Sequence, residues 1–299
     1  MPAPTLTFHD DPAAFLREAG AHLAVDPVVN TVLATIAERA ASDDAAGVPA
    51  DPATPYRWWV VVRDGDAVVG AAMRTAPFEP FPLFLLPMPE DGARALARAL
   101  HARGEPVRGV NGARPAADAC AAELAALTDG VVREGLHTRL HRLDRVVPPG
   151  PARGSLRPAA AGEVDLVVAW FNAFAAAADE QAGRPPGSLH RGTSSPEDLA
   201  RRVAQEQVWL WVDEDGVPVH LSAMHPPSFG AARIAPVYTP PGHRGRGYAG
   251  NTVAALSQRI LDAGAVACLY TDQANPTSNR LYTALGYRPV VDMVDLVVA

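Results

Sequence analysis

The sequence predicts a mixed α/β protein made of two similar halves, each with a mixed, mostly antiparallel sheet flanked by helices. The length of 299 residues fits two domains of roughly 150 residues each. The chain also matches itself at an offset of 151 residues, which pairs Trp58 with Trp209. In each half, two strand-like runs around an Asp-Gly turn are followed by helical and strand-like segments in alternation.

Composition limits the classes of function. Hydrophobic residues make up 48% and charged residues 20%, which excludes a disordered chain and a coiled-coil rod. A net charge of −7 argues against nucleic acid or an anionic membrane as a partner. The N-terminus has early acids and no apolar h-region, and no stretch reaches about 18 consecutive apolar residues, so we expect a soluble, cytoplasmic protein. Cys120 and Cys268 have no neighbours at metal-ligand spacing, so we expect neither a disulfide framework nor a metal site.

The internal repeat sets the expected domain division. The same offset pairs Asp64-Gly65 with Asp215-Gly216 at the tips of two predicted hairpins. It also pairs Gly135 with Gly286, each followed by a strand-like tail. The Pro- and Gly-rich stretch Val146–Ser155 is the predicted linker. We therefore expect domains at residues 1–147 and 148–299.

Hydrophobic periodicity and turn residues predict the elements of the first half. The expected elements, in order, are a helical region (Pro12–Ala40), two hairpin strands (Trp58–Arg63 and Ala67–Arg74), a strand (Phe81–Leu86), a helix (Asp91–Arg103), a strand (Val107–Val110), a helix (Ala113–Leu127) and a tail strand (Leu136–Val146).

The second half is expected to repeat this order. Its predicted elements are two helices (Gly162–Ala178 and Pro196–Glu206), two hairpin strands (Val208–Val212 and Val217–Met224), a strand (Ala232–Thr239), a helix (Tyr248–Ala263), a strand (Val266–Thr271), a helix (Pro276–Leu285) and a tail strand (Tyr287–Val298). Ser195 before Pro196 is a good N-cap with proline at N1.

The most informative stretch runs from a strand through a glycine-rich loop into a helix, over residues 237–249. Glycines let the backbone approach a ligand closely, and the N–H groups at a helix N-terminus attract anions such as a pyrophosphate. Arg244 and Arg246 add positive charge there. A plain surface turn is the alternative interpretation.

A dinucleotide-binding fingerprint is a further alternative. Gly245, Gly247 and Gly250 spell G-x-G-x-x-G, and Asp272 ends the next strand. However, Pro240–Arg244 separate the first of these glycines from its strand, and only 27 residues follow Asp272. This spacing disfavours the fingerprint.

Two motifs resemble the GCN5-related N-acetyltransferases (GNAT). Residues Arg244–Ala249 match the R/Q-x-x-G-x-G/A signature, and Asn275–Tyr287 are similar to the second motif, N-x-x-S/A-x-x-x-Y-x-x-x-G-[FY]. The match covers about Leu156–Val298, and the first half resembles the family only through the repeat. The resemblance implies two tandem GNAT-like domains and acetyl-CoA as co-substrate. The residues it assigns to the cofactor are Val237, Tyr238, Thr239, Arg244, Gly245, Arg246, Gly247, Tyr248, Ala249, Asn275 and Ser278.

The resemblance also implies a reaction, the transfer of an acetyl group from a thioester to a primary amine. The Val237 N–H would polarise the thioester carbonyl if its strand separates from the neighbouring strand, because Pro236 has no N–H. Tyr282 matches the position of the family's general acid, and its alternative role is that of a core tyrosine on a helix.

The general base, the acceptor and the oligomeric state are left open by the sequence. Candidate bases are His220, His225, Glu206, Tyr238 or a chain of water molecules. The loop Gln181–Ser194, which contains His190, is the expected place for the acceptor, most simply a small-molecule amine.

The first half is expected to lack a cofactor site. The repeat places Gly242–Ala249 on Asp91–Arg98, which has an aspartate and no glycine run, and Tyr282 on Val131. The first half therefore looks like a degenerate copy of the second. The alternative function for the whole chain is a non-catalytic acyl-CoA-binding or regulatory protein on the same fold.

Overall fold

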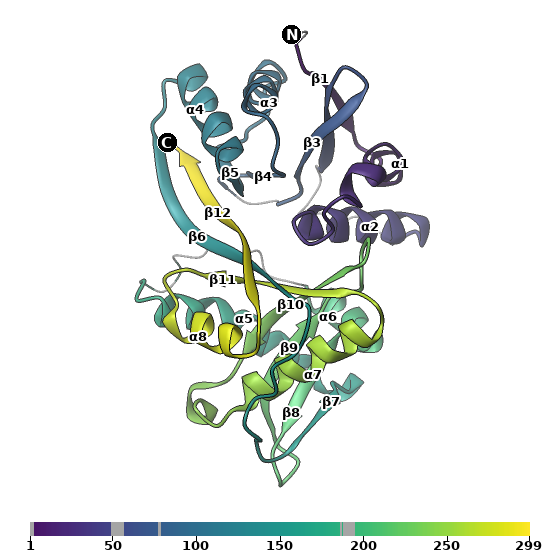
Figure 1. Cartoon of the computed structure of the whole chain (residues 1–299), viewed down its shortest axis with the longest axis vertical. Helices are drawn as coiled ribbons and strands as arrows, with labels where there is room; N and C mark the ends of the chain where they lie inside the picture. The colour runs from purple at the N-terminus through teal and green to yellow at the C-terminus, as the bar shows by residue number, and fades with distance from the viewer. Residues whose placement is uncertain (1–2, 49–56, 77–78, 186, 188–194) are drawn as a thin grey trace. The chain divides into compact units, whose positions relative to one another are not determined.

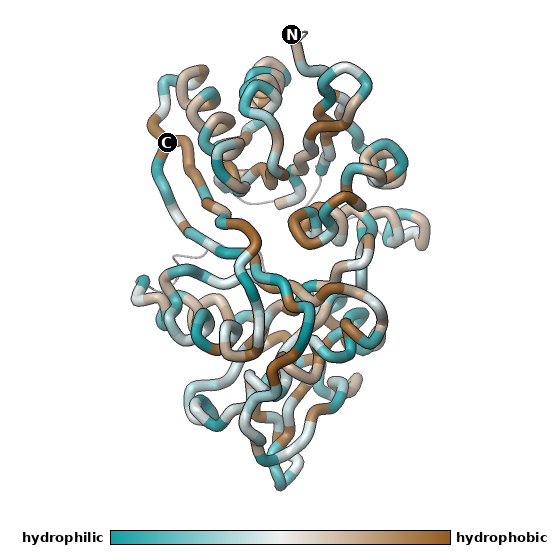
Figure 2. The backbone as a smooth tube through the Cα atoms, in the orientation of Figure 1, coloured by the Kyte–Doolittle hydropathy of each residue, from teal (hydrophilic) through white to brown (hydrophobic). Residues whose placement is uncertain are grey.

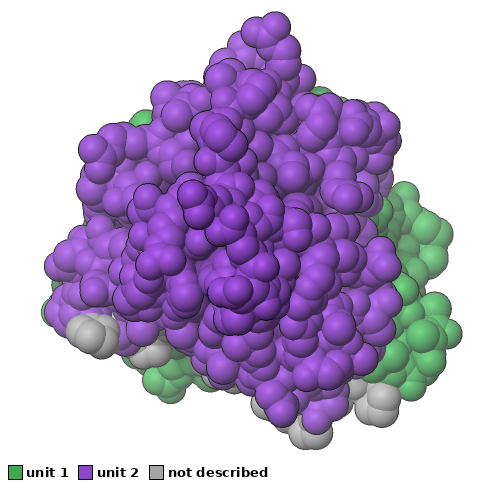
Figure 3. Space-filling model, turned by 90° about the horizontal axis from the view of Figure 1, so that it is seen from below, with its two compact units in different colours: residues 1–139, 291–299 green, residues 140–290 purple. Residues whose placement is uncertain are grey.

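The computed structural model describes residues 3–48, 57–76, 79–185, 187 and 195–299. The chain forms two compact units, residues 1–139 with 291–299 and residues 140–290, coloured separately in Figure 3. These units do not coincide with the expected division after residue 147. The last strand of each sequence half crosses from one unit into the other, which a repeat in the sequence cannot reveal.

The first half of the chain contains helices and strands at nearly all the predicted places (Figure 1). They are β1 (Thr5–His9), α1 (Pro12–Leu23), α2 (Thr31–Ala45), β2 (Trp58–Asp64), β3 (Ala67–Arg74), β4 (Pro82–Leu85), α3 (Glu90–Ala102), β5 (Gly109–Ala113), α4 (Ala116–Thr128) and β6 (Val132–Leu143).

The second half has the same order of helices and strands, apart from two short 3-10 turns. Its elements are β7 (Ser155–Pro158), η1 (Ala161–Glu163), α5 (Val164–Gln181), α6 (Pro196–Ala204), β8 (Val208–Val212), β9 (Pro218–Met224), β10 (Ala231–Tyr238), η2 (Pro241–His243), α7 (Tyr248–Asp262), β11 (Val266–Asp272), α8 (Pro276–Ala284) and β12 (Arg288–Val298). The mixed α/β fold class is confirmed.

The predicted helical region Pro12–Ala40 consists of two helices, because the chain turns between Leu23 and Thr31 and the Asn30 side chain donates to the Leu23 carbonyl at 3.1 Å. The first strand of each half, β1 and β7, was not predicted. These strands are only five and four residues long and lie at sheet edges, where they carry little hydrophobic pattern.

In the first unit the strands follow the order β1-β2-β3-β4-β5-β12-β6. The C-terminal strand β12 pairs antiparallel with β5, from Met293 opposite Ala113 to Val297 opposite Gly109. It is therefore an inner strand, and Figure 2 shows it largely hydrophobic, whereas β6 beside it is mostly hydrophilic. Helices α3 and α4 lie side by side and contribute to the same core cluster.

In the second unit the order is β6-β11-β10-β9-β8-β7, with only the last residues of β6 belonging to this unit. The predicted hairpin of β8 and β9 is confirmed, and Trp209 lies opposite Ser222 in it. The apolar face of α7 packs on β10 and β11 through Val253, Leu256 and Ile260. The predicted N-cap is also confirmed, since the Ser195 hydroxyl accepts from the Asp198 N–H at 3.1 Å.

One helical stretch of the described residues, Ala161–Gln181, is long and apolar enough to cross a membrane by length and composition alone. Within the unit it packs on its neighbours through aromatic side chains. Trp170 meets Tyr238 edge to face at 5.9 Å, and the Arg202 guanidinium lies 5.2 Å from the Phe171 ring centre. These contacts, with acids near both ends of the helix, are typical of a helix on the surface of a domain.

We expect β12 to stabilise the first unit although it comes from the second half of the sequence. Val294 is 2% exposed in that unit's core, whereas Val131 is 64% exposed. Val294→Ala should lower the free energy of unfolding by about 2 kcal/mol, because two buried methyl groups are lost and a cavity is left. The matched Val131→Ala should change it by less than about 0.5 kcal/mol. Urea unfolding measures the change in the free energy of unfolding for both variants. Equal losses would contradict the assignment of β12 to the core of the first unit.

Candidate active site

The parting of two parallel strands creates the candidate site. Strands β10 and β11 pair only at Ala231–Arg233 with residues 266–268, although both continue further. The register of β10 against β9 shifts between Ile234 and Val237, so a bulge turns β10 away from β11. Val237 then pairs with Ser222 of β9 on one side and has no partner strand among the described residues of β11. The role suggested for the Val237 N–H requires that its strand separate from the neighbouring strand, and the structure contains this separation.

The corresponding strands of the first unit do not part. All four residues of β4, Pro82–Leu85, pair in parallel with residues 109–112 of β5. The helix that follows, α3, begins with Glu90 and Asp91 in its first turn, where they would repel a phosphate. The two units therefore share an order of elements and differ in whether these two parallel strands stay paired.

The glycine-rich loop leads from β10 to the N-terminus of α7. Gly245 and Gly247 have φ of +77° and +82°, in the left-handed region that glycine adopts without strain. Gly247 is the N-cap residue of α7, and no side chain caps the helix. The N–H groups of residues 245–249 find no acceptor in the part of the chain that the structure describes. Five donors at a positive helix end are therefore free to meet an anion.

The two loop arginines make different contacts. Arg244 donates from Nε to the Thr239 carbonyl at 3.2 Å and from Nη1 to the Glu180 carboxylate at 3.2 Å. Arg246 is exposed and donates to the Gly242 carbonyl at 3.3 Å. Arg244 thus ties the loop to α5, whereas the Arg246 contact stays within the loop.

The linker covers part of this loop, which the sequence interpretation missed. The Asn251 side chain donates to the Gly150 carbonyl at 2.9 Å, and a Cβ on Gly247 would lie 3.5 Å from that of Ala152. Trp211 stacks on Tyr248 at 6.3 Å and donates to the Arg153 carbonyl at 2.8 Å. Tyr248 is thus buried by packing, so only its backbone faces the loop. Proline-rich residues carry no periodicity, which is why their sequence showed only a break.

Asn275 and Ser278 form the start of α8. The Asn275 side-chain oxygen accepts from the N–H groups of Thr277 and Ser278, both at 3.1 Å, and its amide donates to Gln181 at 3.1 Å. The Ser278 hydroxyl donates back to the Asn275 carbonyl at 3.2 Å. This is an N-cap, so the motif residues have a structural role at this position.

Tyr282 lies on α8, in the core cluster of the second unit, against which Val237 also packs. It is 6% exposed and meets Tyr287 edge to face at 5.9 Å. Burial raises the pKa of the Tyr282 hydroxyl above its ordinary value, so the group is protonated at neutral pH. The described residues offer its hydroxyl no hydrogen bond, and the oxygen is not among the fully enclosed unpaired atoms.

The candidate bases differ in their surroundings. His220 is fully buried between the hydroxyls of Thr239, at 2.7 Å, and Ser222, at 2.9 Å. Burial lowers the pKa of His220 to about 3, so it is a poor proton acceptor. The Arg233 guanidinium lies 3.3 Å from the His225 ring, and Glu206 is exposed beyond the end of α6. His190 lies outside the described residues.

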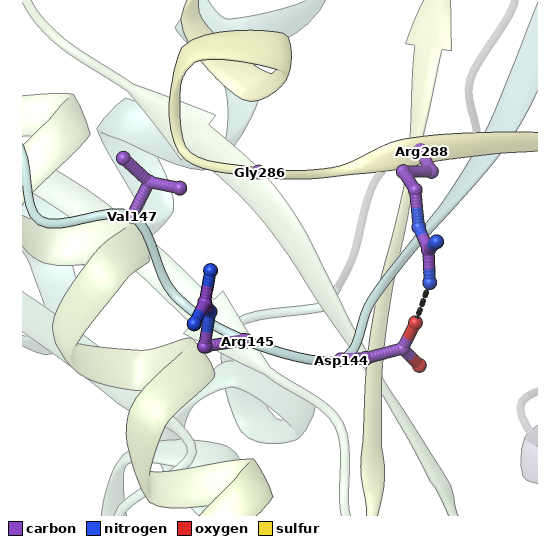
Figure 4. A pocket seen from close by; sticks show the side chains of 5 residues that line it. All are labelled: Asp144, Arg145, Val147, Gly286 and Arg288. Atoms are coloured by element: carbon purple, nitrogen blue, oxygen red, sulfur yellow. Dashed lines mark hydrogen bonds and ion pairs between the residues drawn. The ribbon is translucent and has the colours of Figure 1, made fainter.

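A pocket of about 280 Å³ lies elsewhere in the second unit (Figure 4). Its lining residues are Asp144, Arg145, Val147, Gly286 and Arg288. Asp144 pairs with Arg288 across it. Of the second motif it contains only Gly286, and none of the residues assigned to the cofactor or to catalysis. The described residues also contain no group of three or more His, Cys, Asp or Glu side chains placed to hold a metal ion.

Comparison with solved structures decides the fold family. A GCN5-related N-acetyltransferase from Sphaerobacter thermophilus aligns over 99% of this chain and 95% of its own, with 16% identity and a TM-score of 0.57. A tandem GNAT protein from the clavulanic acid biosynthesis pathway aligns over 99% and 98%, with 17% identity and a TM-score of 0.54. The chain has the GNAT fold. The resemblance noted in the sequence is confirmed at this level.

Further comparisons give another similar structure and a matching family model. A Drosophila protein aligns over 98% of both chains with 14% identity and a TM-score of 0.67. Residues 224–294, which hold the parted strand, the glycine loop and α8, match the FR47-like protein family model. No match was found among curated protein sequences. The family-model match thus coincides with the elements that build the candidate GNAT site.

We expect His220 to stay neutral well below neutral pH. The unfolded chain, with a histidine pKa near 6.5, takes up a proton that the folded protein excludes. The stability from His220 is therefore complete above about pH 6.5 and falls by roughly 1.4 kcal/mol per pH unit toward its folded pKa of about 3. Histidine NMR signals should show one ring that does not titrate between pH 4.5 and 8 and is absent in His220→Gln. A titration of that ring near pH 6.5 would contradict the burial.

Proposed function

We propose that this chain is an N-acetyltransferase that transfers the acetyl group of acetyl-CoA to a primary amine, with a small molecule as the expected acceptor. The observation that carries the proposal is the parted β10, which leads into a loop with five unpaired N–H groups at the start of α7. Acetyltransferases are among the solved structures with this fold, which supports acyl transfer as the class of reaction.

The residues present fit acetyl-CoA. The N–H groups of residues 245–249 would bind its pyrophosphate, and open space beside Gly245 lets phosphate oxygens approach. The backbone of Val237–Thr239 would lie along the pantetheine arm. Asn275 and Ser278 would contact the same arm from α8. Tyr248 and Ala249 would contribute only their backbone.

Two groups would act on the reacting atoms. The amine attacks the thioester carbonyl, the Val237 N–H stabilises the developing oxyanion, and the C–S bond then breaks. The Tyr282 hydroxyl gives its proton to the departing thiolate, since its raised pKa keeps that proton in place at neutral pH. The proton of the amine leaves to water in this proposal. His220 is a poor base because it is buried between two hydroxyls.

The first unit would support the second without binding cofactor. Its paired β4 and β5 leave no opening, and Glu90 and Asp91 occupy the corresponding helix start. We infer that the chain divides by function into residues 1–147, without a cofactor site, and residues 148–299, with one. This is the division expected from a duplication in which one copy has degenerated. We also propose a soluble protein acting in the cytoplasm.

Binding stoichiometry tests the cofactor site. Calorimetry with acetyl-CoA should give one site per chain. Gly247→Val should abolish binding or weaken it by several kcal/mol, because a β-branched side chain is strained at φ +82° and crowds the phosphate. Gly216→Val, also at positive φ but in the β8–β9 turn, controls for loss of stability. Two sites per chain, or full affinity in a folded Gly247→Val protein, would refute the proposal.

Tyr282→Phe separates an enzyme from a non-catalytic binder. The ring keeps its packing against Tyr287 and only the hydroxyl is lost, so affinity for acetyl-CoA should barely change. The kcat should fall by about 10²-fold, the lower end for a general acid, because a thiolate is a tolerable leaving group. An acceptor panel assayed for release of free CoA provides the measurement. An unchanged kcat would assign Tyr282 to the core alone, and no turnover with any amine would favour an acyl-CoA-binding protein.

A further inference from the structure

We propose that the C-terminal turn of α5, residues 179–184, is a polar latch on the cofactor site, and that Glu180 in it sets the affinity for CoA. This inference rests on the proposed function. Two residues that the motifs assign to the cofactor, Arg244 and Asn275, are held by neighbouring residues of this one turn. The turn matches neither motif, and the sequence assigned its last residues, as part of the loop Gln181–Ser194, only to the acceptor.

The latch makes two contacts. The Arg244 Nη1 donates to the Glu180 Oε2 at 3.2 Å, and the Asn275 amide donates to the Gln181 Oε1 at 3.1 Å. Arg244 belongs to the loop before α7 and Asn275 to the start of α8. Glu180 and Gln181 therefore reach both sides of the proposed cofactor site from consecutive positions.

A buried ion pair network fixes the turn in place. Asp179 is fully buried and accepts from the Arg184 Nε at 3.2 Å, and Arg184 also pairs with Asp272 at 2.5 Å. The Arg184 N–H donates to the Asp179 carbonyl at 2.9 Å, which closes the turn. Asp272 ends β11, and its carbonyl accepts from the N–H of Asn275 at 3.0 Å. The turn is thus anchored to the strand that parts from β10.

The Glu180 carboxylate contacts the arginine, Arg244, that would otherwise meet a phosphate of CoA. Glu180 neutralises Arg244, so a phosphate must either displace that carboxylate or bind beside it. The Glu180 side chain is 66% exposed, so it leaves at little cost. Asn275 is 7% exposed, and Gln181 accepts from its amide, which has two N–H donors. Glu180 therefore opposes CoA binding, which lowers affinity for cofactor and product alike.

The test is calorimetry of CoA binding to the full-length protein at low ionic strength. Glu180→Gln removes the charge and keeps the shape, so CoA should bind roughly three- to fivefold more tightly. The gain should vanish in an Arg244→Gln background, because Glu180 acts through Arg244, and should shrink at high salt. Glu197→Gln, which removes an exposed carboxylate at the start of α6 in the same unit, should leave the affinity unchanged.

The outcomes separate the latch from the proposed function. Binding of CoA by the wild type with equal affinity in Glu180→Gln overturns the latch and leaves the cofactor site standing. Weaker binding in Glu180→Gln also overturns it, and shows that Glu180 positions Arg244 for the ligand instead. An equal gain in Glu197→Gln overturns it by assigning the effect to net charge. Failure of every variant, wild type included, to bind CoA overturns the proposed function and the latch together.

Discussion

The separation of β10 from β11 after Arg233 is the constraint on which the rest of the second unit depends. A parallel pair that stayed together would give the end of β10 a partner strand on both edges and leave no backbone polar group there for a ligand. The bulge between Ile234 and Val237 prevents this pairing while β9 still holds one edge of the strand. The end of β10 therefore keeps a fixed position and an unpaired edge at the same time, and it leads directly into the glycine loop.

The first unit shows what the same order of elements does without that constraint. Its β4 and β5 pair along the whole length of β4, and the chain enters α3 through acidic residues. The apolar cluster that includes Val294, Leu296 and Val298 of β12 completes the core of this unit. The same sheet flanked by helices can therefore form a unit with a candidate cofactor site or a unit without one. The difference lies in a few residues at one strand end.

Local signals predicted most of the fold and part of the site. The Asp-Gly hairpins, the glycine loop and the helix at Tyr248 were readable because turn chemistry and periodicity act over short stretches. The sequence did not show that β6 and β12 each pass from one unit into the other, because pairing between strands far apart in the chain leaves no local pattern. It also did not show that Gly150 and Ala152 lie against the start of α7, because their residue types indicate only a break. The contacts of Glu180 and Gln181 also depend on tertiary packing alone.

The motif residues have structural roles that complicate any inference from motifs alone. Asn275 and Ser278 cap α8, Tyr282 fills the core, and Thr239 holds His220 by its hydroxyl and Arg244 by its carbonyl. Folding alone would therefore favour these residue types at these positions. The N–H groups of residues 245–249 differ, because they have no acceptor among the described residues. Helices α2, α3 and α4 also begin without a side-chain cap, so the feature particular to α7 is the pair of positive-φ glycines, Gly245 and Gly247, which brings five free N–H groups together at the start of the helix.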